Sequence, residues 1–343
     1  MFKIEENNST KNFEIISIEL THLCNLKCEW CFNQHSSEYN NKKFLNFEEL
    51  IKTLLLFEKW RIKNAIKKPL IKLTGGEPTL YYRINELILF IKSYLGYKIK
   101  LNTNGLLLHK LDQKIISDNL DIILFSYHFG DNTMYNKSYI EEKDKAAKFI
   151  SGLANNITKV ICSRININLI NNLEEHIKYI EDNFNFKRYI LWFPLLAKGE
   201  KLEFSKEDYI SLYKKIIELK KKVKIEIEIG FSPAFCMNGE ENLIDSVTSI
   251  KNLITFSGNR INITPSGFLT DSYYYTDDKI RVKNINAFDE FFNSNFFKKN
   301  SKLESLPEKC KNCNYLQKCG GGNRMLTYMQ TGDFYSPDPW MSE

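Results

Sequence analysis

Several kinds of segment are missing from this sequence. No apolar run reaches 18 residues, and the first ten residues, MFKIEENNST, contain no apolar signal core. Neither a membrane-spanning helix nor a secretory signal is therefore predicted. The net charge of +6 comes from 48 basic and 42 acidic residues without a dense basic block, so nucleic acid is not indicated as a partner. We expect a cytoplasmic protein that does not bind membranes.

Cysteine, by contrast, is plentiful and unevenly placed. The chain has 343 residues, of which 43% are hydrophobic, enough for one large domain and a smaller one. Six of its eight cysteines fall in two tight groups, at Cys24 to Cys31 and at Cys310 to Cys319. In a cytoplasmic chain such grouping favours metal or cluster chemistry over disulfide bonds.

Apolar strands alternate with amphipathic helices through the first two thirds of the chain. The expected strands are Glu14–Leu20, Leu70–Thr74, Lys98–Asn102, Asp121–Tyr127, Lys159–Asn166 and Arg188–Phe193. The expected helices between them are Asn46–Lys63, Ile84–Leu95, Leu111–Asn119, Glu141–Ala154 and Leu173–Asn183. This alternation predicts βα units with a parallel sheet. Six units favour an α/β fold, a partial (β/α)6 TIM-like barrel with its chemistry at the carboxyl ends of the strands.

The pattern changes after a further helix, Ser205–Lys222, and a strand, Lys224–Gly230. The turn Pro265-Ser266-Gly267 predicts a β-hairpin of Arg260–Thr264 and Phe268–Tyr274. We therefore predict three parts: an N-terminal arm at residues 1–13, the barrel at residues 14–230 and a cysteine-rich extension at residues 231–343.

The first cysteine group follows the first strand at C-x3-C-x2-C spacing, as Cys24, Cys28 and Cys31. Three thiolates on one tight loop can hold three corners of a [4Fe–4S] cluster and leave one iron without a protein ligand. The alternatives are redox thiols or a zinc loop, for which His22 is a candidate fourth ligand.

This loop, with the aromatic Trp30 before its third cysteine, resembles that of the radical SAM superfamily. The resemblance implies that Cys24, Cys28 and Cys31 hold the cluster and that Trp30 lies against adenine. It also implies that the open iron binds the amino and carboxyl groups of S-adenosylmethionine (SAM). The reduced cluster would then cleave SAM to methionine and a 5′-deoxyadenosyl radical.

A second motif, Gly75-Gly76-Glu77-Pro78, follows the second strand. Two glycines let the backbone approach a ligand closely, and nearby carbonyls with Glu77 offer acceptors for an ammonium group. An ordinary glycine turn is the alternative. The motif matches the GGEP of the radical SAM superfamily, which implies that it holds the methionine amino group of SAM.

Polar residues also end the third and fourth strands. Thr103-Asn104-Gly105 resembles the TNG that closes the third strand in that superfamily, and a plain turn is the alternative. Ser126 occupies the position where the superfamily often contacts the ribose, although its frequent Ser-x-Asp is absent. His128 is a candidate proton donor or acceptor, with a structural histidine as the alternative.

The fifth and sixth strands supply further candidates. Cys162, Arg164 and Asn166 alternate with apolar residues and are predicted to share one face. An inward Arg164 needs an anion, and the resemblance implies the SAM carboxylate; an outward, exposed arginine is the alternative. Phe193 ends the sixth strand, where the superfamily offers adenine an apolar surface.

The second cysteine group reads Cys310-x2-Cys313-x5-Cys319 before three glycines. It resembles the SPASM/twitch-like extension that carries auxiliary [4Fe–4S] clusters. Three expected cysteines are replaced, by Thr255 before Gly258, by Ser272 and by Asn323, which implies that one auxiliary cluster is lost. The other keeps three ligands, and its fourth is open between Cys236, Asp338 and no protein ligand. A zinc knuckle is the alternative for the whole group.

The resemblance implies hydrogen abstraction from an unactivated carbon, most often of a ribosomally made peptide or protein, by crosslinking, epimerisation or oxidation. A flavodoxin- or ferredoxin-type protein would donate electrons. Because the barrel begins within about fifteen residues, a separate leader-peptide-binding protein is expected if the substrate is a peptide. The alternatives are a small-molecule dehydrogenase or epimerase acting on a sugar or aminocyclitol, and a non-catalytic Fe–S scaffold.

Overall fold

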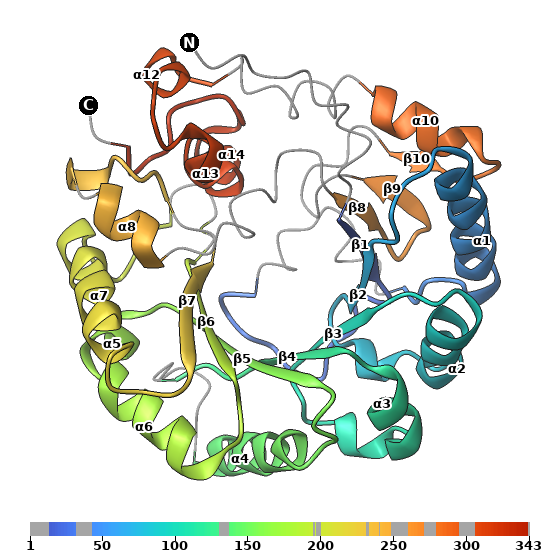
Figure 1. The fold of residues 1–343 in the computed structure, drawn as a ribbon, viewed down its shortest axis with the longest axis horizontal. Helices are drawn as coiled ribbons and strands as arrows, with labels where there is room; N and C mark the ends of the chain where they lie inside the picture. Colours follow the sequence, from blue (N-terminus) through green and yellow to red (C-terminus); the bar gives the residue numbers. More distant parts are fainter. Residues whose placement is uncertain are drawn as a thin grey trace. The chain divides into compact units, whose positions relative to one another are not determined.

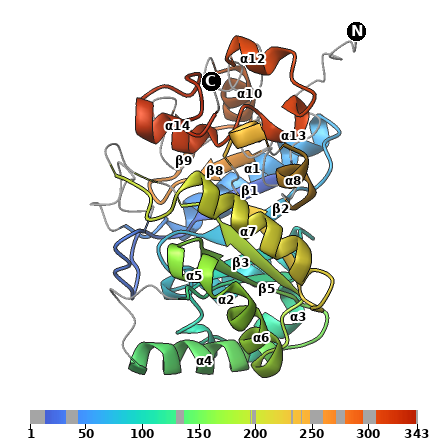
Figure 2. The same ribbon diagram turned by 90° about the vertical axis from the view of Figure 1, so that its left-hand side faces the viewer.

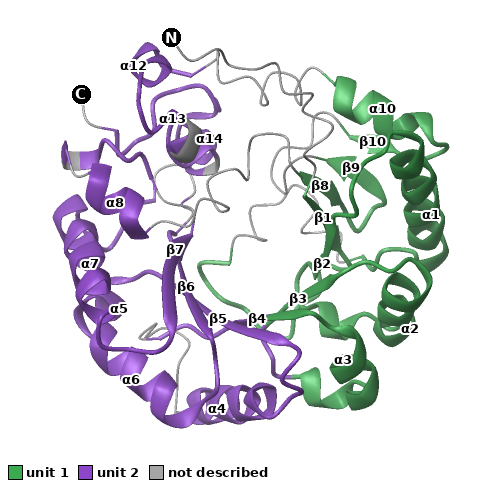
Figure 3. Cartoon of the chain, in the orientation of Figure 1, with its two compact units in different colours: residues 1–103, 107–123, 255–302 green, residues 104–106, 124–254, 303–343 purple. Residues whose placement is uncertain are grey.

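The chain divides into two compact units, each assembled from separate stretches of sequence (Figure 3). The computed structural model describes residues 14–31, 43–129, 137–194, 196, 200–230, 233–239, 241–247, 260–270, 279–294 and 306–341. Unit 1 comprises residues 1–103, 107–123 and 255–302, and unit 2 comprises residues 104–106, 124–254 and 303–343. The boundary falls inside strand β4 (Ile122–Ser126). The predicted division at residue 230 concerns sequence domains and stays a prediction.

Unit 1 is built around parallel strands with helices α1, α2 and α3 along one side (Figure 1). Its strands are β1 (Ile15–Glu19), β2 (Leu70–Thr74), β3 (Ile99–Thr103), β8 (Arg260–Ile263), β9 (Phe268–Thr270) and β10 (Ile280–Arg281). Its helices are α1 (Phe47–Lys63), η4 (Pro78–Leu80), α2 (Ile84–Leu89), the π-helix η5 (Phe90–Tyr94), η6 (Leu108–Lys110), α3 (Gln113–Asn119) and α10 (Asn286–Asn293). The strand order within this unit is β10-β9-β8-β1-β2-β3.

Strand β1 lies between two parallel partners, β2 and β8. The register pairs Ile15 with Leu70 and Glu19 with Thr74, so β1 and β2 end at the same level. Because the strands are parallel, the loops that follow them leave from the same edge of the sheet. The first cysteine group and the Gly75–Pro78 motif both begin at this edge.

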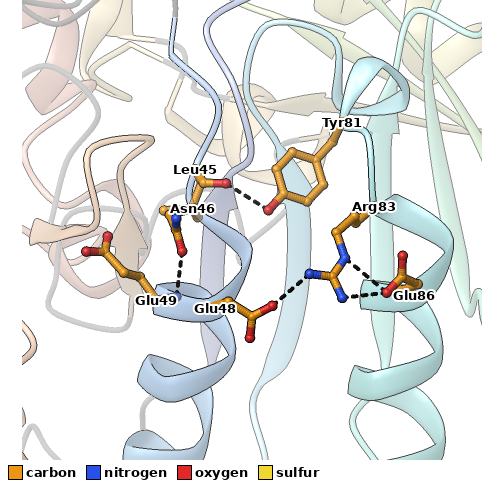
Figure 4. A network of polar contacts seen from close by, with 7 residues as sticks. All are labelled: Leu45, Asn46, Glu48, Glu49, Tyr81, Arg83 and Glu86. Carbon is orange, nitrogen blue, oxygen red and sulfur yellow. Dashed lines mark hydrogen bonds and ion pairs between the residues drawn. The ribbon is translucent and has the colours of Figure 1, made fainter.

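Polar side chains tie the start of α1 to the segment after β2 (Figure 4). The Asn46 side chain accepts the backbone N–H of Glu49 at 2.9 Å and caps α1, as this residue type does at helix N-termini. Arg83 bridges Glu48, at 2.8 Å, and Glu86, at 2.6 Å. A further bond completes the connection, from the Tyr81 hydroxyl to the Leu45 carbonyl at 2.8 Å.

Unit 2 repeats the strand–helix alternation. Its remaining strands are β5 (Thr158–Arg164), β6 (Arg188–Trp192) and β7 (Glu226–Gly230). Its helices are α4 (Lys137–Ser151), α5 (Ile167–Asn171), α6 (Leu173–Asn183), α7 (Lys206–Leu219), η7 (Met237–Gly239), α8 (Glu241–Val247), α12 (Glu308–Lys311), α13 (Leu316–Cys319) and α14 (Arg324–Thr331). β5, β6 and β7 pair in parallel. Figure 2 shows α5, α6 and α7 together, with α5 contacting both neighbours.

Most of the predicted elements are present, and the α/β fold class is confirmed. β2 and α6 have the predicted bounds. The predicted helix Ile84–Leu95 is instead α2 followed by the π-turn η5. The hairpin of β8 and β9 is antiparallel as expected, but β9 is described only to Thr270. None of the helices in the described ranges combines the length and apolar character needed to cross a membrane.

Candidate functional site

The first cysteine group lies on the loop that follows β1. Cys24 is exposed, and Cys28 and Cys31 are half-buried. The Cys24 sulfur accepts the backbone N–H of Leu26 at 3.4 Å, and the Cys31 N–H donates to the Cys28 carbonyl at 3.0 Å. Trp30 is half-buried in the turn between Cys28 and Cys31. The loop thus presents three accessible thiols within eight residues.

The glycines of the second motif pack directly against the backbone of this loop. Gly76 N–H donates to the Thr21 carbonyl at 2.6 Å, and Glu77 N–H donates to the Leu23 carbonyl at 2.8 Å. A Cβ on Gly75 would lie 2.4 Å from the Thr21 oxygen, and one on Gly76 would lie 2.2 Å from the Leu23 oxygen. No side chain fits at such distances. Two motifs about forty-five residues apart in the sequence therefore pack against each other through their backbones.

Glu77 connects the end of β3 to the Gly75–Pro78 motif. Its carboxylate is 1% exposed, and its Oε1 accepts the hydroxyls of Thr79, at 2.6 Å, and Thr103, at 2.7 Å. Pro78 opens the short helix η4, whose N-cap is Glu77. Sequence reasoning assigned Glu77 to an ammonium group and missed its bonds to Thr79 and Thr103. Their positions, one directly after GGEP and one opening the TNG, were the available signal.

His22 was the candidate fourth ligand of a zinc loop. Its Nε2 lies 3.6 Å from Glu19 Oε2, and both side chains are buried. This contact involves one ring nitrogen only, and the other, Nδ1, has no hydrogen-bond partner among the described residues.

A buried lysine of unit 2 connects Asn104, the residue after β3, with the last residue of β4. Lys143 of α4 is 1% exposed, and its Nζ donates to the Asn104 and Ser126 carbonyls at 2.5 Å each. A buried ammonium group needs such acceptors. Sequence reasoning missed it, although Lys143 lies at helical spacing from the buried Ala146, Ala147 and Ile150.

Ser126 and His128 follow each other along the end of β4. The Cys162 thiol lies 3.7 Å from the Ser126 hydroxyl, and His128 Nδ1 accepts the backbone N–H of Arg164 at 2.9 Å. Burial, with the nearby cations of Lys143 and Arg164, lowers the pKa of His128 well below its ordinary value. The imidazole is therefore neutral near pH 7, with its proton on Nε2.

Cys162 and Arg164 lie two residues apart in β5, as the predicted shared face requires, but β5 ends at Arg164 and Asn166 lies beyond it. Asn166 is instead the N-cap of α5: its Oδ1 accepts Leu169 N–H at 2.7 Å, and its Nδ2 donates to the Phe129 carbonyl at 2.9 Å. Arg164 is mostly buried, with Nη1 3.8 Å from a Glu203 carboxylate oxygen. Arg164 therefore already has one anionic neighbour.

Phe193 lies in an aromatic cluster. Its ring centroid is 5.0 Å from those of Tyr209 and Trp340 and 6.1 Å from that of Phe204. The side chain is fully buried. This placement favours a packing role over an open surface for adenine.

The second cysteine group assembles residues from three segments of unit 2. Cys310 and Cys319 are buried, and Cys313 and Cys236 are half-buried. Burial raises the pKa of Cys310, to which the charges of Cys236, Cys313 and Asp338 contribute. Burial also raises the pKa of Cys319 to about 12. All five predicted ligand candidates therefore lie close enough to interact.

Asn323, where the SPASM pattern expects cysteine, is the N-cap of α14 and accepts the Leu326 N–H at 3.1 Å. Thr255, Gly258 and Ser272 lie outside the described residues. None of the eight cysteines, all within the described ranges, forms a disulfide bond. In the same ranges, no three His, Cys, Asp or Glu side chains are already arranged around a single metal position.

Comparison with known proteins agrees with these motifs. Residues 18–181 match the family model described as Radical SAM superfamily. The chain is 26% identical over 283 residues to a probable GTP 3′,8-cyclase of Sulfurisphaera tokodaii, covering 80% of this chain and 86% of that protein. It is 28% identical over 280 residues to the protein of the same name from Saccharolobus solfataricus, covering 79% and 86%.

Solved structures share the fold. anSMEcpe with bound AdoMet superposes with a TM-score of 0.66 at 21% identity, covering 95% of this chain and 90% of that one. Streptococcus suis SuiB bound to S-adenosylmethionine gives 0.69 at 15% identity, covering 97% and 78%. These likenesses confirm the predicted fold, a partial TIM-like barrel.

Proposed function

We propose that this chain, a radical SAM superfamily enzyme, abstracts hydrogen from an unactivated carbon of a ribosomally made peptide or protein. The observation that supports the enzymatic part is the junction between the cysteine loop and Gly75–Glu77. Its three thiols are accessible, and its backbone is held by the Gly76 and Glu77 N–H groups.

The cofactors of this superfamily are a [4Fe–4S] cluster and SAM. The donor set fits them: Cys24, Cys28 and Cys31 would hold the cluster, and one iron would remain for SAM. When bound, the reduced cluster supplies the electron that cleaves SAM. The chain itself binds and orients the cofactors and the substrate and shields them from water.

The residues that the sequence predicts for SAM binding are kept in this proposal. Gly75, Gly76 and Glu77 would position the methionine amino group, with Pro78 fixing the turn and Trp30 beside adenine. In unit 2 the proposed contacts are Asn104, Ser126, Arg164, Asn166 and Phe193. The structure gives Asn166 and Phe193 packing or capping roles, so Ser126 and Arg164 are the stronger members. His128, the candidate catalytic residue, is proposed to donate a hydrogen bond toward substrate through Nε2, since its Nδ1 accepts the Arg164 N–H.

The peptide substrate is supported by the second cysteine group. A crosslink or oxidation removes two hydrogens: one ends in 5′-deoxyadenosine, and the other leaves as a proton and an electron. A second cluster on Cys310, Cys313 and Cys319 would accept that electron. anSMEcpe, which shares the fold, has also been solved with AdoMet and a peptide, Cp18Cys. A separate leader-peptide-binding protein and a flavodoxin- or ferredoxin-type donor belong to the proposal.

The test is anaerobic incubation of reconstituted enzyme with SAM, a reductant and a peptide encoded beside it. We expect 5′-deoxyadenosine together with a peptide that has lost two hydrogens, or that gains deuterium in heavy water if it is epimerised. Turnover of SAM that no peptide stimulates would contradict the peptide assignment.

A nucleotide substrate is the second candidate, because the sequence relatives at 26–28% identity are named GTP 3′,8-cyclase. Incubation with GTP in place of peptide distinguishes the two. A new nucleotide product, formed with 5′-deoxyadenosine, would favour this candidate. The earlier alternative, a sugar or aminocyclitol dehydrogenase, has no comparable support.

A further inference from the structure

The segment before η7 is fixed against the second cysteine group. The Phe235 N–H donates to the Cys319 sulfur at 3.4 Å. Phe235 is buried, and its ring lies 6.0 Å from that of Tyr315, between Cys313 and Cys319 in the sequence. Cys236 is the next residue along this fixed backbone, and its side chain is half-buried. Phe235 and Cys319 are 84 residues apart in the sequence. The segment that contains Phe235 therefore brings a fourth thiol, that of Cys236, to the second cysteine group.

Asp338, the competing candidate, already has other partners. It is 2% exposed. Its Oδ2 accepts the Asn323 N–H at 2.7 Å, its Oδ1 accepts the Trp340 N–H at 2.8 Å, and the Ala234 N–H also binds it. A carboxylate that accepts several backbone N–H groups organises a loop. Coordination of iron would require some of these bonds to break.

The backbone around Asp338 is also closely packed. A Cβ on Gly322 would lie 2.3 Å from the Asp338 Oδ2, so the carboxylate is held against the loop that follows Cys319. Through Ala234 and Asn323 it joins the two segments that carry Cys236 and Cys319. Asp338 therefore positions the thiols.

A buried cation completes the site. Arg324 is 7% exposed and donates to the Phe334, Ser336 and Gly321 carbonyls. Its Nε is buried without a hydrogen-bond partner among the described residues. The buried carboxylate of Asp338 is its main counter-charge, and Cys310 and Cys319 also lie near it, so the guanidinium adds positive charge beside the thiols.

We infer that Cys236 is the fourth protein ligand of the second iron–sulfur cluster, with Asp338 holding the loops that carry the thiols. The inference rests on the proposed function in one respect, the presence of that cluster. All four irons would then have protein ligands, so this cluster would transfer electrons without binding substrate through iron.

The test isolates the second site by changing Cys24, Cys28 and Cys31 to Ala and reconstituting the chain anaerobically with iron and sulfide. We expect about four irons per chain, from one cubane. Adding Cys236→Ala should lower this to about three or fewer, with the paramagnetic signal of a three-iron cluster. Cys236→Ser should keep iron but change the spectrum of the reduced cluster. Asp338→Asn and the control Cys162→Ala should keep about four irons.

Alkylation of the unmutated chain gives a second readout that does not depend on a variant folding. Cys236, half-buried in the metal-free chain, should become protected together with Cys310, Cys313 and Cys319 on reconstitution. Four irons with an unchanged spectrum in Cys236→Ala, or an alkylated Cys236 in the loaded protein, would overturn the inference. Zinc or no metal in the parent variant would overturn it together with the second cluster. Formation of 5′-deoxyadenosine by the unmutated chain tests the proposed function separately.

Discussion

The two cysteine groups have the same number of clustered thiols but opposite surroundings. At the first, Cys24 is exposed and the loop is held by backbone hydrogen bonds to Gly76 and Glu77. At the second, Cys310 and Cys319 are buried beside the buried charges of Asp338 and Arg324. An open site made from backbone leaves space for a ligand that enters and leaves. An enclosed site made from side chains suits a group that remains bound and exchanges only electrons.

Removing one cysteine group at a time gives the largest expected difference in SAM cleavage between the two sites. Changing Cys24, Cys28 and Cys31 to Ala should abolish formation of 5′-deoxyadenosine and leave about four of about eight irons. Changing Cys310, Cys313 and Cys319 to Ala should also leave about four irons, but SAM cleavage should persist while substrate oxidation is lost. Iron analysis and chromatography of the nucleoside measure both. Loss of SAM cleavage in the second variant would contradict the division of roles.

The glycine contact at the first group predicts the next largest effect. Gly76→Ala places a methyl group 2.2 Å from the Leu23 oxygen, so we expect a loss of about 3 kcal/mol in the free energy of unfolding, with weaker SAM binding. Gly152→Ala is the matched control, because its new methyl meets nothing closer than 3.5 Å. It should be neutral or stabilising by about 0.5 kcal/mol. If denaturant titrations gave the same free energy of unfolding for Gly76→Ala and Gly152→Ala, the close packing of Gly76 against Leu23 would not matter for stability.

Lys143 predicts an intermediate effect at the strand ends of unit 2. Lys143→Met removes both donors to the Asn104 and Ser126 carbonyls, and we expect a loss of about 2 kcal/mol. If Lys143 also positions Ser126, the dissociation constant of SAM should rise while the iron content stays unchanged. The exposed Lys145 of the same helix is the control, as Lys145→Met. A stability loss with unaltered SAM affinity would limit Lys143 to a structural role.

The smallest expected effect is on the stability of the fold at acidic pH. Burial lowers the pKa of His176, which stacks on Phe129, to about 4. The unfolded chain takes up this proton near pH 6.5, before the folded chain does, so stability falls as the pH drops from about 6.5 towards 4. Allowing for its partial exposure, we expect His176→Phe to reduce this loss by about 1 kcal/mol at pH 5. Denaturant titrations at pH 5 and pH 7 test it, with the exposed His109→Gln as control.

Much of this molecule follows from local sequence patterns. The bounds of β2 and α6, and the positions of the cysteine loop and Gly75–Pro78 directly after their strands, were predicted because periodicity and motif spacing are local signals. Asn166 was misplaced because an N-cap and a strand end look alike in an alternating sequence. Capping bonds, such as that to Leu169, form only once the helix exists.

The rest depends on contacts between distant segments. No sequence spacing connects Phe235 with Cys319, and nothing near the first strand indicates that β8 will pair with it. The buried Lys143 was available from the helical pattern, but a lysine on an apolar face conflicts with the usual preference for exposure. Such conflicts are expected where function has shaped the sequence.

The parallel pairing of β1 with β8 has a consequence for synthesis of the chain. β1 is made among the first twenty residues, whereas its partner at Arg260–Ile263 emerges about 240 residues later. At about 5 to 20 residues per second, one edge of β1 remains unpaired for roughly 12 to 50 seconds. We therefore expect the nascent chain to need protection from edge-to-edge association, and unit 1 to complete its sheet only after most of unit 2 has been translated.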